Sequence, residues 1–214
     1  MRISITFLYT IFRYGYPPSV AAVFRSLQEI RRMGFRYVEM EGLGPRHLAG
    51  MYRRRLELRH ALADAGMHVH NFCVVDQALV SSDRPRQRAA LDRFRLGAEL
   101  GDYLGAETLH LASYAPPVRY TGERPYRLAR GAGYRFANRT RVTIPRGFDW
   151  ERVWAALVRS CQACADIAAG HRKIVLMEPR VGEVICSVDS LRRLIEHVGR
   201  PNFKANFDTG HFSA

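Results

Sequence analysis

Residues 174–178 read Ile-Val-Leu-Met-Glu and residues 203–211 read Phe-Lys-Ala-Asn-Phe-Asp-Thr-Gly-His, and these two stretches decide the fold. Each begins as a short apolar run, typical of a buried strand in a parallel sheet, and each ends in side chains that can bind a metal. A helix of ordinary length fits between them. Glu178, Asp208 and His211 are therefore expected at the same end of neighbouring parallel strands, where α/β proteins place metals and substrates.

The same alternation of apolar runs and helical patterns extends to the start of the chain. Strands are predicted at 2–8, 36–40, 67–75, 107–112, 173–177 and 203–207. Helices are predicted at about 19–33, 46–65, 84–104, 149–169 and 187–198. Residues 113–148 remain as a long loop rich in Pro, Gly, Arg and Tyr, which is typical of a lid or of a disordered segment.

Alternating strands and helices fit either an open doubly wound sheet or a (β/α)8 barrel. A dinucleotide-binding sheet needs Gly-x-Gly-x-x-Gly after its first strand, and the segment after Phe7 has no such glycines. Polar residues instead recur at the strand ends, as around the rim of a barrel. Because a TIM barrel typically needs ~250 residues, we predict a single, incomplete α/β barrel domain of about six βα units over residues 1–214.

Composition and charge limit the class of protein. The net charge is +13, but Lys173 and Lys204 are the only lysines and no run of five basic residues occurs. An arginine-biased solvated surface therefore explains the charge better than a nucleic-acid footprint. No run approaches the ~18 apolar residues of a membrane span. The four cysteines, including Cys161 and Cys164 at helical spacing, indicate reduced core thiols of a cytoplasmic protein.

The polar strand ends suggest metal chemistry, although Glu178 and Asp208 each fit a second role. Glu178 follows a buried strand, so it is a ligand, a catalytic base or the ion-pair partner of Arg180. Asp208 and His211 are separated by Thr and Gly, which allow a tight turn that aims an oxygen and a nitrogen at one ion. An Asp that caps a helix gives the same pattern. The combination with Glu178 on the preceding strand strengthens the metal interpretation.

These motifs resemble the xylose isomerase-like barrels, which include sugar and sugar-phosphate isomerases and epimerases. The resemblance covers nearly the whole chain and rests on Gly34-Phe-Arg-Tyr-Val-Glu39, Leu104-Gly-Ala106, Leu-Met-Glu178-Pro and Phe-Asp208-Thr-Gly-His211. It implies that Glu178 is both a metal ligand and the catalytic acid or base, that Asp208 is a metal ligand, and that His211 contacts substrate. A further His and a second catalytic Glu are expected from strands seven and eight, which these residues do not contain.

The resemblance also implies the reaction and the partners. One divalent ion, Mn in the first place and Mg, Co or Zn as alternatives, would polarise the substrate oxygens. A carboxylate would then remove a proton next to a carbonyl, through an enediolate. The implied partner is a small-molecule sugar or sugar phosphate, without nucleic acid or membrane, and a homo-oligomer is left open. Four residues are expected to bind substrate besides His211: His70, His110, Arg180 and Glu183.

Two other functions stay open at this point. Endonuclease IV-type enzymes for apurinic sites share the barrel and use histidines of the third and fourth strands for zinc, where His70 and His110 are expected near the strand ends. This chain departs from them, with Asn-Phe after His70 and Asp208-Thr-Gly-His where they have Asp-Thr-Cys-His. A non-catalytic barrel fragment is the third class. Missing strands expose sheet edges, so the 214 residues are expected either to be a partial sequence, which is the favoured interpretation and would be inactive in isolation, or to pair with a second copy that covers the gap.

Overall fold

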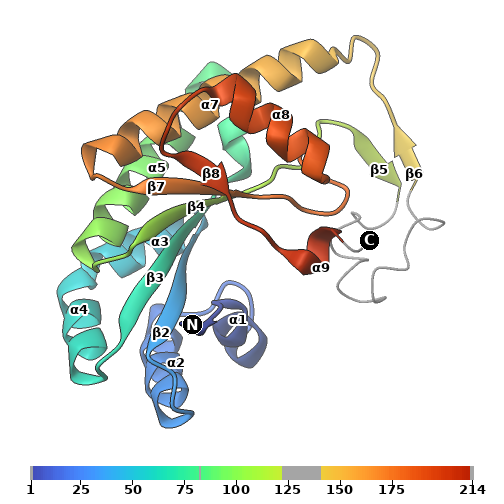
Figure 1. Ribbon diagram of the computed structural model, residues 1–214. Coiled ribbons are helices and arrows are strands. Elements are labelled where there is room, and N and C mark those ends of the chain that lie inside the picture. The colour runs from blue at the N-terminus through green and yellow to red at the C-terminus, as the bar shows by residue number, and fades with distance from the viewer. Residues whose placement is uncertain (1, 82, 122–140, 213–214) are drawn as a thin grey trace.

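A parallel sheet of six strands forms the centre of the protein (Figure 1). The computed structural model describes residues 2–81, 83–121 and 141–212. The strand order is β1-β2-β3-β4-β7-β8, and every neighbouring pair is parallel. The strands are β1 (Ser4–Ile5), β2 (Tyr37–Leu43), β3 (His68–Val75), β4 (Thr108–Ala112), β7 (Ile174–Glu178) and β8 (Phe203–Ala205). This confirms the α/β, TIM-barrel-type fold. Within the described ranges β1 and β8 are the two edges, so the barrel is not closed.

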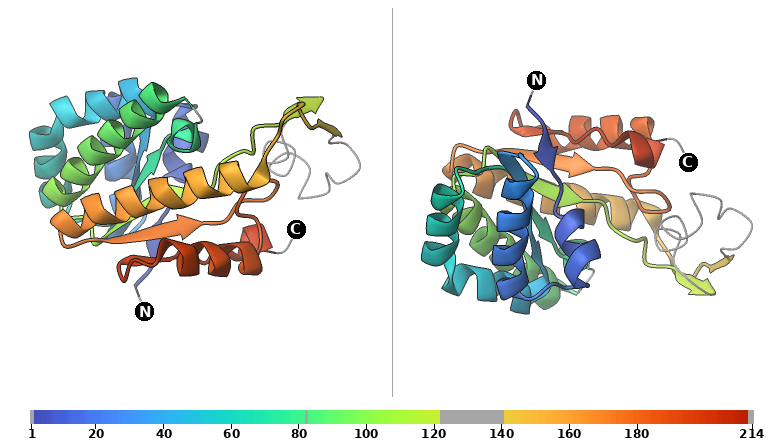
Figure 2. Two further views of the ribbon diagram at one scale, coloured as in Figure 1. Left: turned by 90° about the horizontal axis from the view of Figure 1, so that it is seen from above. Right: turned by 90° about the horizontal axis from the view of Figure 1, so that it is seen from below.

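Helices follow the strands, and the longer ones, from α2 to α8, cover the outer face of the sheet (Figure 2). They are α1 (Leu8–Tyr14), α2 (Val20–Arg32), α3 (Gly44–Arg53), α4 (Arg55–Asp64), α5 (Arg84–Tyr103), α7 (Trp150–Gly170), α8 (Val188–Val198) and α9 (Thr209–Phe212), with a 3-10 turn η1 (Gln77–Val80). Side-chain caps set several of their starts: Ser19 accepts from the amide of Ala22, and Ser187 with Ser190 forms a reciprocal capping box. In the part of the chain that is described, no helix is long and apolar enough to cross a membrane.

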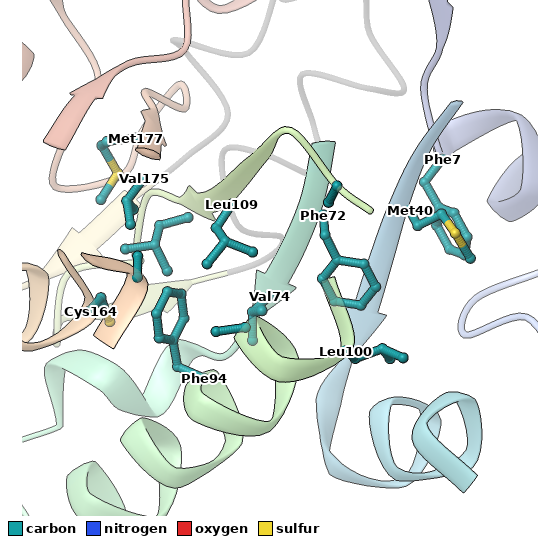
Figure 3. Close-up of a cluster of buried hydrophobic side chains, with 14 of the residues drawn as sticks. Phe7, Met40, Phe72, Val74, Phe94, Leu100, Leu109, Cys164, Val175 and Met177 are labelled. Atoms are coloured by element: carbon teal, nitrogen blue, oxygen red, sulfur yellow. The ribbon is translucent and has the colours of Figure 1, made fainter. Parts of the chain in front are cut away.

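The main core lies between α5, α7 and the sheet (Figure 3). Phe72, Phe94 and Leu109 are fully buried there, and each such side chain contributes about 1.5–3 kcal/mol by leaving water. Gly97 on α5 permits this close packing, because an added Cβ would lie 2.4 Å from a methyl group of Val74. The helix can therefore approach the sheet closely only without a side chain at this position.

Several element boundaries differ from the sequence prediction: β2 continues to Leu43 and β8 ends at Ala205. The strand predicted at 2–8 is limited to Ser4–Ile5, and a helix that was not predicted, α1, follows from Leu8. The single helix predicted at 46–65 is two helices, which meet at Arg54. The first strand was predicted too long because the mostly apolar residues up to Leu8 have the pattern of a strand. In the structure Leu8 instead begins α1, which buries Thr10 and Ile11.

The predicted long loop contains a small antiparallel pair, β5 (Arg119–Thr121) with β6 (Arg141–Thr143). These strands extend away from the sheet. Residues 122–140 of the loop lie outside the described residues. At the loop's start Tyr114 is buried, and its carbonyl accepts from the amide of Val184. The start of the loop is thus anchored to the segment that follows β7.

Candidate active site

A pocket of about 340 Å³ receives side chains from every strand of the central sheet or from the segment that follows it. Its polar members come from elements far apart in the sequence. The lining residues are Ser4, Thr6, Leu8, Glu39, Glu41, His70, Asn71, His110, Leu176, Glu178, Arg180, Asn206, Phe207, Asp208, Thr209 and His211. The pocket therefore contains both motifs that the sequence indicated, Glu178 at the end of β7 and Asp208 with His211 after β8.

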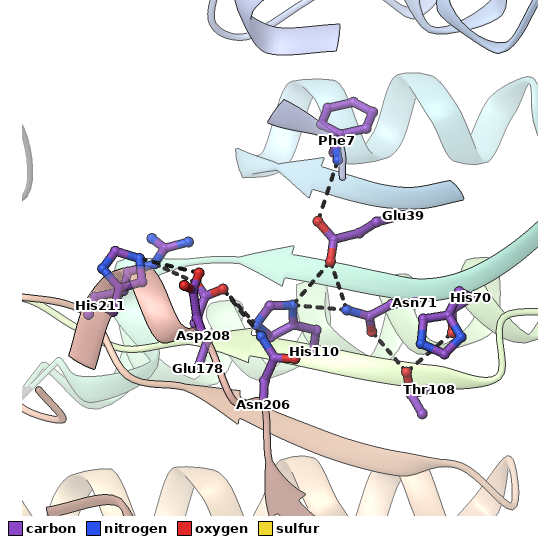
Figure 4. A network of polar contacts seen from close by, with 11 residues as sticks. Phe7, Glu39, His70, Asn71, Thr108, His110, Glu178, Asn206, Asp208 and His211 are labelled. Atoms are coloured by element: carbon purple, nitrogen blue, oxygen red, sulfur yellow. Dashed lines mark hydrogen bonds and ion pairs between the residues drawn. The ribbon is translucent and has the colours of Figure 1, made fainter. Parts of the chain in front are cut away.

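Glu178, the last residue of β7, is held by two donors. Arg180 Nε donates to Glu178 Oε2 at 2.9 Å, and Asn206 Nδ2 donates to Glu178 Oε1 at 3.3 Å (Figure 4). The side chains of Glu178 and Arg180 are only 13% and 14% exposed. The ion pair with Arg180 that the sequence left open is thus present, and it holds a carboxylate inside the pocket in a defined orientation.

Asp208 both caps a helix and faces an imidazole. Its Oδ1 accepts from the amide of Gly210 at 2.8 Å, and its Oδ2 lies 3.9 Å from Nε2 of His211. The helix-cap interpretation is therefore correct for Oδ1, while Oδ2 faces the ring of His211. Burial, helped by Arg180, lowers the pKa of the nearly buried His211 although Asp208 and Glu178 oppose this shift. His211 is consequently neutral at pH 7.

A buried polar chain joins β2, β3 and β4. Asn71 Nδ2 lies 2.9 Å from Glu39 Oε2 and 3.0 Å from His110 Nδ1, and the other oxygen of Glu39 accepts weakly from the amide of Phe7 at 3.5 Å. On its far side, His110 Nε2 lies 3.8 Å from Glu178 Oε1. Figure 4 shows these groups in a row that leads from Phe7 to Asn206. This row of polar side chains links the predicted base, Glu178, with Glu39 on β2.

The two carboxyl groups of β2 have different protonation states. Burial favours the neutral form of Glu39, but the neighbouring imidazole of His110, 3.7 Å away, and the hydrogen bond from Asn71 lower its pKa below the ordinary value. Burial and the charge of Glu39 raise the pKa of Glu41 to about 8, against the effect of Arg180. Glu39 is thus a carboxylate and Glu41 a neutral acid at pH 7, a division that a shared buried site enforces on neighbouring carboxyls.

His110 experiences competing influences on its charge. Burial disfavours the imidazolium, but Cys73, Glu39 and Glu178 together raise the pKa of His110 well above its ordinary value. Burial raises the pKa of Cys73 to about 11, so this group is a neutral thiol at pH 7. The carboxylates of Glu39 and Glu178 therefore supply the charge that stabilises the imidazolium.

Two predicted substrate-binding residues lie elsewhere than expected. His70 is the third residue of β3 rather than near its carboxyl end, and it occupies a register shift in which Val69 pairs with Val38 and Asn71 with Glu39. Its ring is half-exposed and pairs with Glu107 at 3.2 Å, although it also lines the pocket. His110 is likewise in the middle of β4, and buried. The extra residue in β3 directs Asn71, not His70, into the buried chain.

Glu183 is not part of the pocket lining. Its amide donates to the carbonyl of Arg180 at 3.1 Å, within the turn that follows β7. Among the lining residues that sequence reasoning missed are two amides that bond to the predicted site residues, Asn71 to His110 and Asn206 to Glu178. The signal that could have identified them is an amide within an apolar parallel strand or directly at its end, since buried polar groups there need specific partners.

The chemistry of the donors fits a divalent ion. Glu178 and Asp208 bring carboxylates to one pocket, and oxygen donors suit Mg or Mn while an added imidazole suits Mn, Zn or Co. In residues 2–81, 83–121 and 141–212, no three or more His, Cys, Asp and Glu side chains are arranged as a ready ligand cluster. Glu178 and Asp208 therefore remain predicted ligands, and both line the pocket.

Comparisons with known proteins agree with the fold. A family model described as xylose isomerase-like TIM barrel matches residues 27–214. No curated protein matches the chain. A D-psicose 3-epimerase from Clostridium cellulolyticum H10, solved with D-tagatose, has a TM-score of 0.66 at 15% identity over 96% of this chain and 62% of its own.

Two further solved structures are similar at comparable levels. A probable 3-DHS dehydratase from Bacillus anthracis has a TM-score of 0.65 at 17% identity, over 100% of this chain and 65% of its own. A xylose isomerase-like TIM barrel protein from Mycobacterium smegmatis, in complex with magnesium, has a TM-score of 0.67 at 15% identity, over 91% of this chain and 58% of its own. This chain thus spans less than two thirds of each of these proteins. At such identities the likeness shows the fold.

Proposed function

This chain belongs to the xylose isomerase-like TIM-barrel family, and on that premise we propose that it carries the base and part of the metal site of a sugar or sugar-phosphate isomerase or epimerase. The observation that carries the proposal is Glu178, a mostly buried carboxylate held by Arg180 and Asn206 in a pocket shared with Asp208. The sugar-bound epimerase and the magnesium-bound barrel among the similar structures support the substrate class and the need for a divalent ion.

The residues around Glu178 and Asp208 have distinct roles in this chemistry. A divalent ion held by Glu178 and Asp208 would supply a Lewis acid for the substrate carbonyl. Glu178 accepts a proton from the carbon next to that carbonyl, because its fixed orientation presents a carboxylate to the bound sugar. Arg180 and Asn206 keep the side chain of Glu178 in place. His211, neutral and nearly buried, faces the pocket beside Asp208 and contacts substrate.

The pocket's charge suits a polyhydroxy substrate. Ionised Glu39 and neutral Glu41 offer an acceptor and a donor for hydroxyl groups, and Arg180 adds a cation that attracts phosphate or enediolate oxygens. The endonuclease alternative needs His70 and His110 as zinc ligands. It is disfavoured because His70 pairs with Glu107 and because Nδ1 of His110 faces an amide.

Solvent-deuterium exchange tests the proposal. The complete protein, loaded with Mn²⁺, is incubated in D₂O with D-fructose, D-tagatose and their phosphates, and incorporation of deuterium next to the carbonyl is followed by NMR. We expect exchange with at least one sugar and its loss in Glu178→Gln, while Glu183→Gln retains it. No exchange with any sugar of the panel contradicts the proposal. Loss of water from the substrate in place of exchange would instead indicate a dehydratase.

A further inference from the structure

The geometry points to His110 as a further catalytic residue, whose Nε2–H donates a hydrogen bond to the substrate oxygen that becomes negatively charged when Glu178 removes the neighbouring proton. This inference rests on the proposed function and adds a residue to it. It depends on three observations: the orientation of the Asn71 amide, the proton that this orientation assigns to the imidazole, and the position of Nε2 in the pocket.

The orientation of the Asn71 amide is fixed by its neighbours. Glu39 Oε2, at 2.9 Å, is an ionised acceptor, so only the NH₂ group of Asn71 can face it. On the opposite side, the hydroxyl of Thr108 donates to Asn71 Oδ1 at 3.0 Å. The reverse orientation would set a carbonyl oxygen against a carboxylate. Asn71 therefore presents its NH₂ group to both Glu39 and His110.

This orientation assigns a hydrogen to Nε2 of His110. Nδ1 lies 3.0 Å from the NH₂ group of Asn71, so in the neutral ring Nδ1 accepts and the hydrogen is on Nε2. In the charged ring both nitrogens carry hydrogen, and Nδ1 then no longer accepts from Asn71 but turns its hydrogen towards the carboxylate of Glu39, 3.7 Å away. Nε2 is thus a donor in either state of the imidazole.

The Nε2 atom lies at the wall of the pocket, on the side of Glu178. It is buried and has no hydrogen-bond partner within the described ranges, and the side chain of His110 is only 4% exposed. Glu178 Oε1, 3.8 Å away, is too distant to accept a hydrogen bond. A buried donor without an acceptor is costly. A substrate oxygen next to Glu178 would satisfy it.

The reaction step balances without proton transfer from His110. The proton leaves carbon for the carboxylate of Glu178, the electron pair of the broken C–H bond forms the C=C bond, and the carbonyl electrons move to oxygen. That oxygen accepts the hydrogen bond from Nε2, which is stronger for the anion than for the ketone. The reverse sequence returns the proton to carbon.

The same geometry distinguishes a donor from a metal ligand. A metal-binding histidine has a bare nitrogen towards the metal and donates from the other nitrogen to a carboxylate or carbonyl. Here Nδ1 faces the NH₂ group of Asn71 at 3.0 Å, whereas the carboxylate of Glu39 is 3.7 Å from it. The partner group therefore matches a hydrogen-bond donor at Nε2.

Nitrogen NMR tests the protonation without substrate or metal. The ¹⁵N-labelled protein is recorded near pH 7, and the His110→Gln spectrum identifies the ring signals of His110. We expect a hydrogen on Nε2, alone or on both nitrogens. A neutral ring with hydrogen on Nδ1 and a bare Nε2 would overturn the inference, whatever the activity of the protein. This measurement needs no variant other than the one used for assignment.

Two substitutions test the catalytic role in the complete protein. His110→Leu removes the donor, whereas His110→Gln places an N–H group near the former Nε2. We expect deuterium exchange to slow about 100-fold in His110→Leu, as when one oxyanion donor is lost, with Mn²⁺ affinity unchanged and exchange largely restored in His110→Gln. Equal losses in both variants, or unchanged exchange in His110→Leu, would contradict the role. Absence of exchange in the unsubstituted protein would refute the proposed function, and the NMR result would then decide this inference separately.

Discussion

Replacing Arg180 by Met is expected to destabilise the metal-free protein by leaving Glu178 charged and nearly buried without its cation. Arg180 Nε is 2.9 Å from Glu178 Oε2, and both side chains are mostly buried. At an effective dielectric constant of about 20, the attraction across this distance is about 6 kcal/mol before desolvation is subtracted. Methionine preserves the apolar stem, so the change removes mainly the charge and its hydrogen bond.

The expected loss of stability depends on the contacts that Glu178 keeps in the Arg180→Met variant. Breaking a buried pair by removing one partner costs about 3–5 kcal/mol. Asn206 still donates to Glu178 Oε1 in the variant, so we expect a loss near the lower end, about 3 kcal/mol. A bound divalent ion would replace the missing cation. The difference between the variant and the unsubstituted protein should therefore shrink when Mn²⁺ is present.

Urea denaturation with and without Mn²⁺ measures both effects. The matched control is Arg200→Met, which removes a closer but exposed ion pair, Arg200 with Asp166 at 2.7 Å. Exposed pairs contribute little because solvent screens them. If Arg180→Met destabilises no more than Arg200→Met in the absence of metal, the pair does not hold Glu178 as described. An unchanged difference upon addition of Mn²⁺ would show that the ion does not take the place of Arg180.

Two further substitutions test a buried acid of the pocket and the packing of α5 on the sheet. Because the pKa of Glu41 is raised to about 8 from 4.5, the folded state binds an extra proton between these values, so stability falls as pH rises through this window, by at most about 5 kcal/mol. Denaturation at pH 5, 7 and 9 should show this slope, and Glu41→Gln should remove it; an equal slope in the variant would exclude Glu41 as its source. Gly97→Ala should cost about 1–3 kcal/mol, because its Cβ would lie 2.4 Å from Val74. Gly170→Ala, where a Cβ meets nothing within 4 Å, is its control, and equal thermal melting of the two variants would contradict the close packing.

The sequence predicted the elements whose periodicity is long and regular. Helices α2, α5 and α7 repeat their apolar residues over several turns, and their predicted bounds agree closely with the structure. Short elements give weaker signals. The two-residue strand β1 and the seven-residue helix α1 cannot be separated by periodicity within residues 2–14.

The candidate site was predictable where a polar residue ends an apolar strand. Glu178 and Asp208 met this condition, and both line the pocket. Asn71 and His110 lie within their strands, so the rule for strand ends does not apply to them. The extra residue at His70 also changes which side chains of β3 point to the pocket side of the sheet. No feature of a single sequence marks such a register shift.

Manganese binding tests most directly the central claim that Glu178 and Asp208 form one divalent-metal site. The measurement is a calorimetric titration of the complete protein with Mn²⁺, repeated for Glu178→Gln, Asp208→Asn and Glu107→Gln. Glu107 is the matched control, a carboxylate that is 38% exposed and pairs with Arg2 and His70. We predict one bound ion per chain, an unchanged affinity in Glu107→Gln, and losses in the other two variants above the roughly 10- to 100-fold that an outer-shell partner costs. If the unsubstituted protein has no affinity for Mn²⁺, or if all four proteins have equal affinity, Glu178 and Asp208 do not form a metal site.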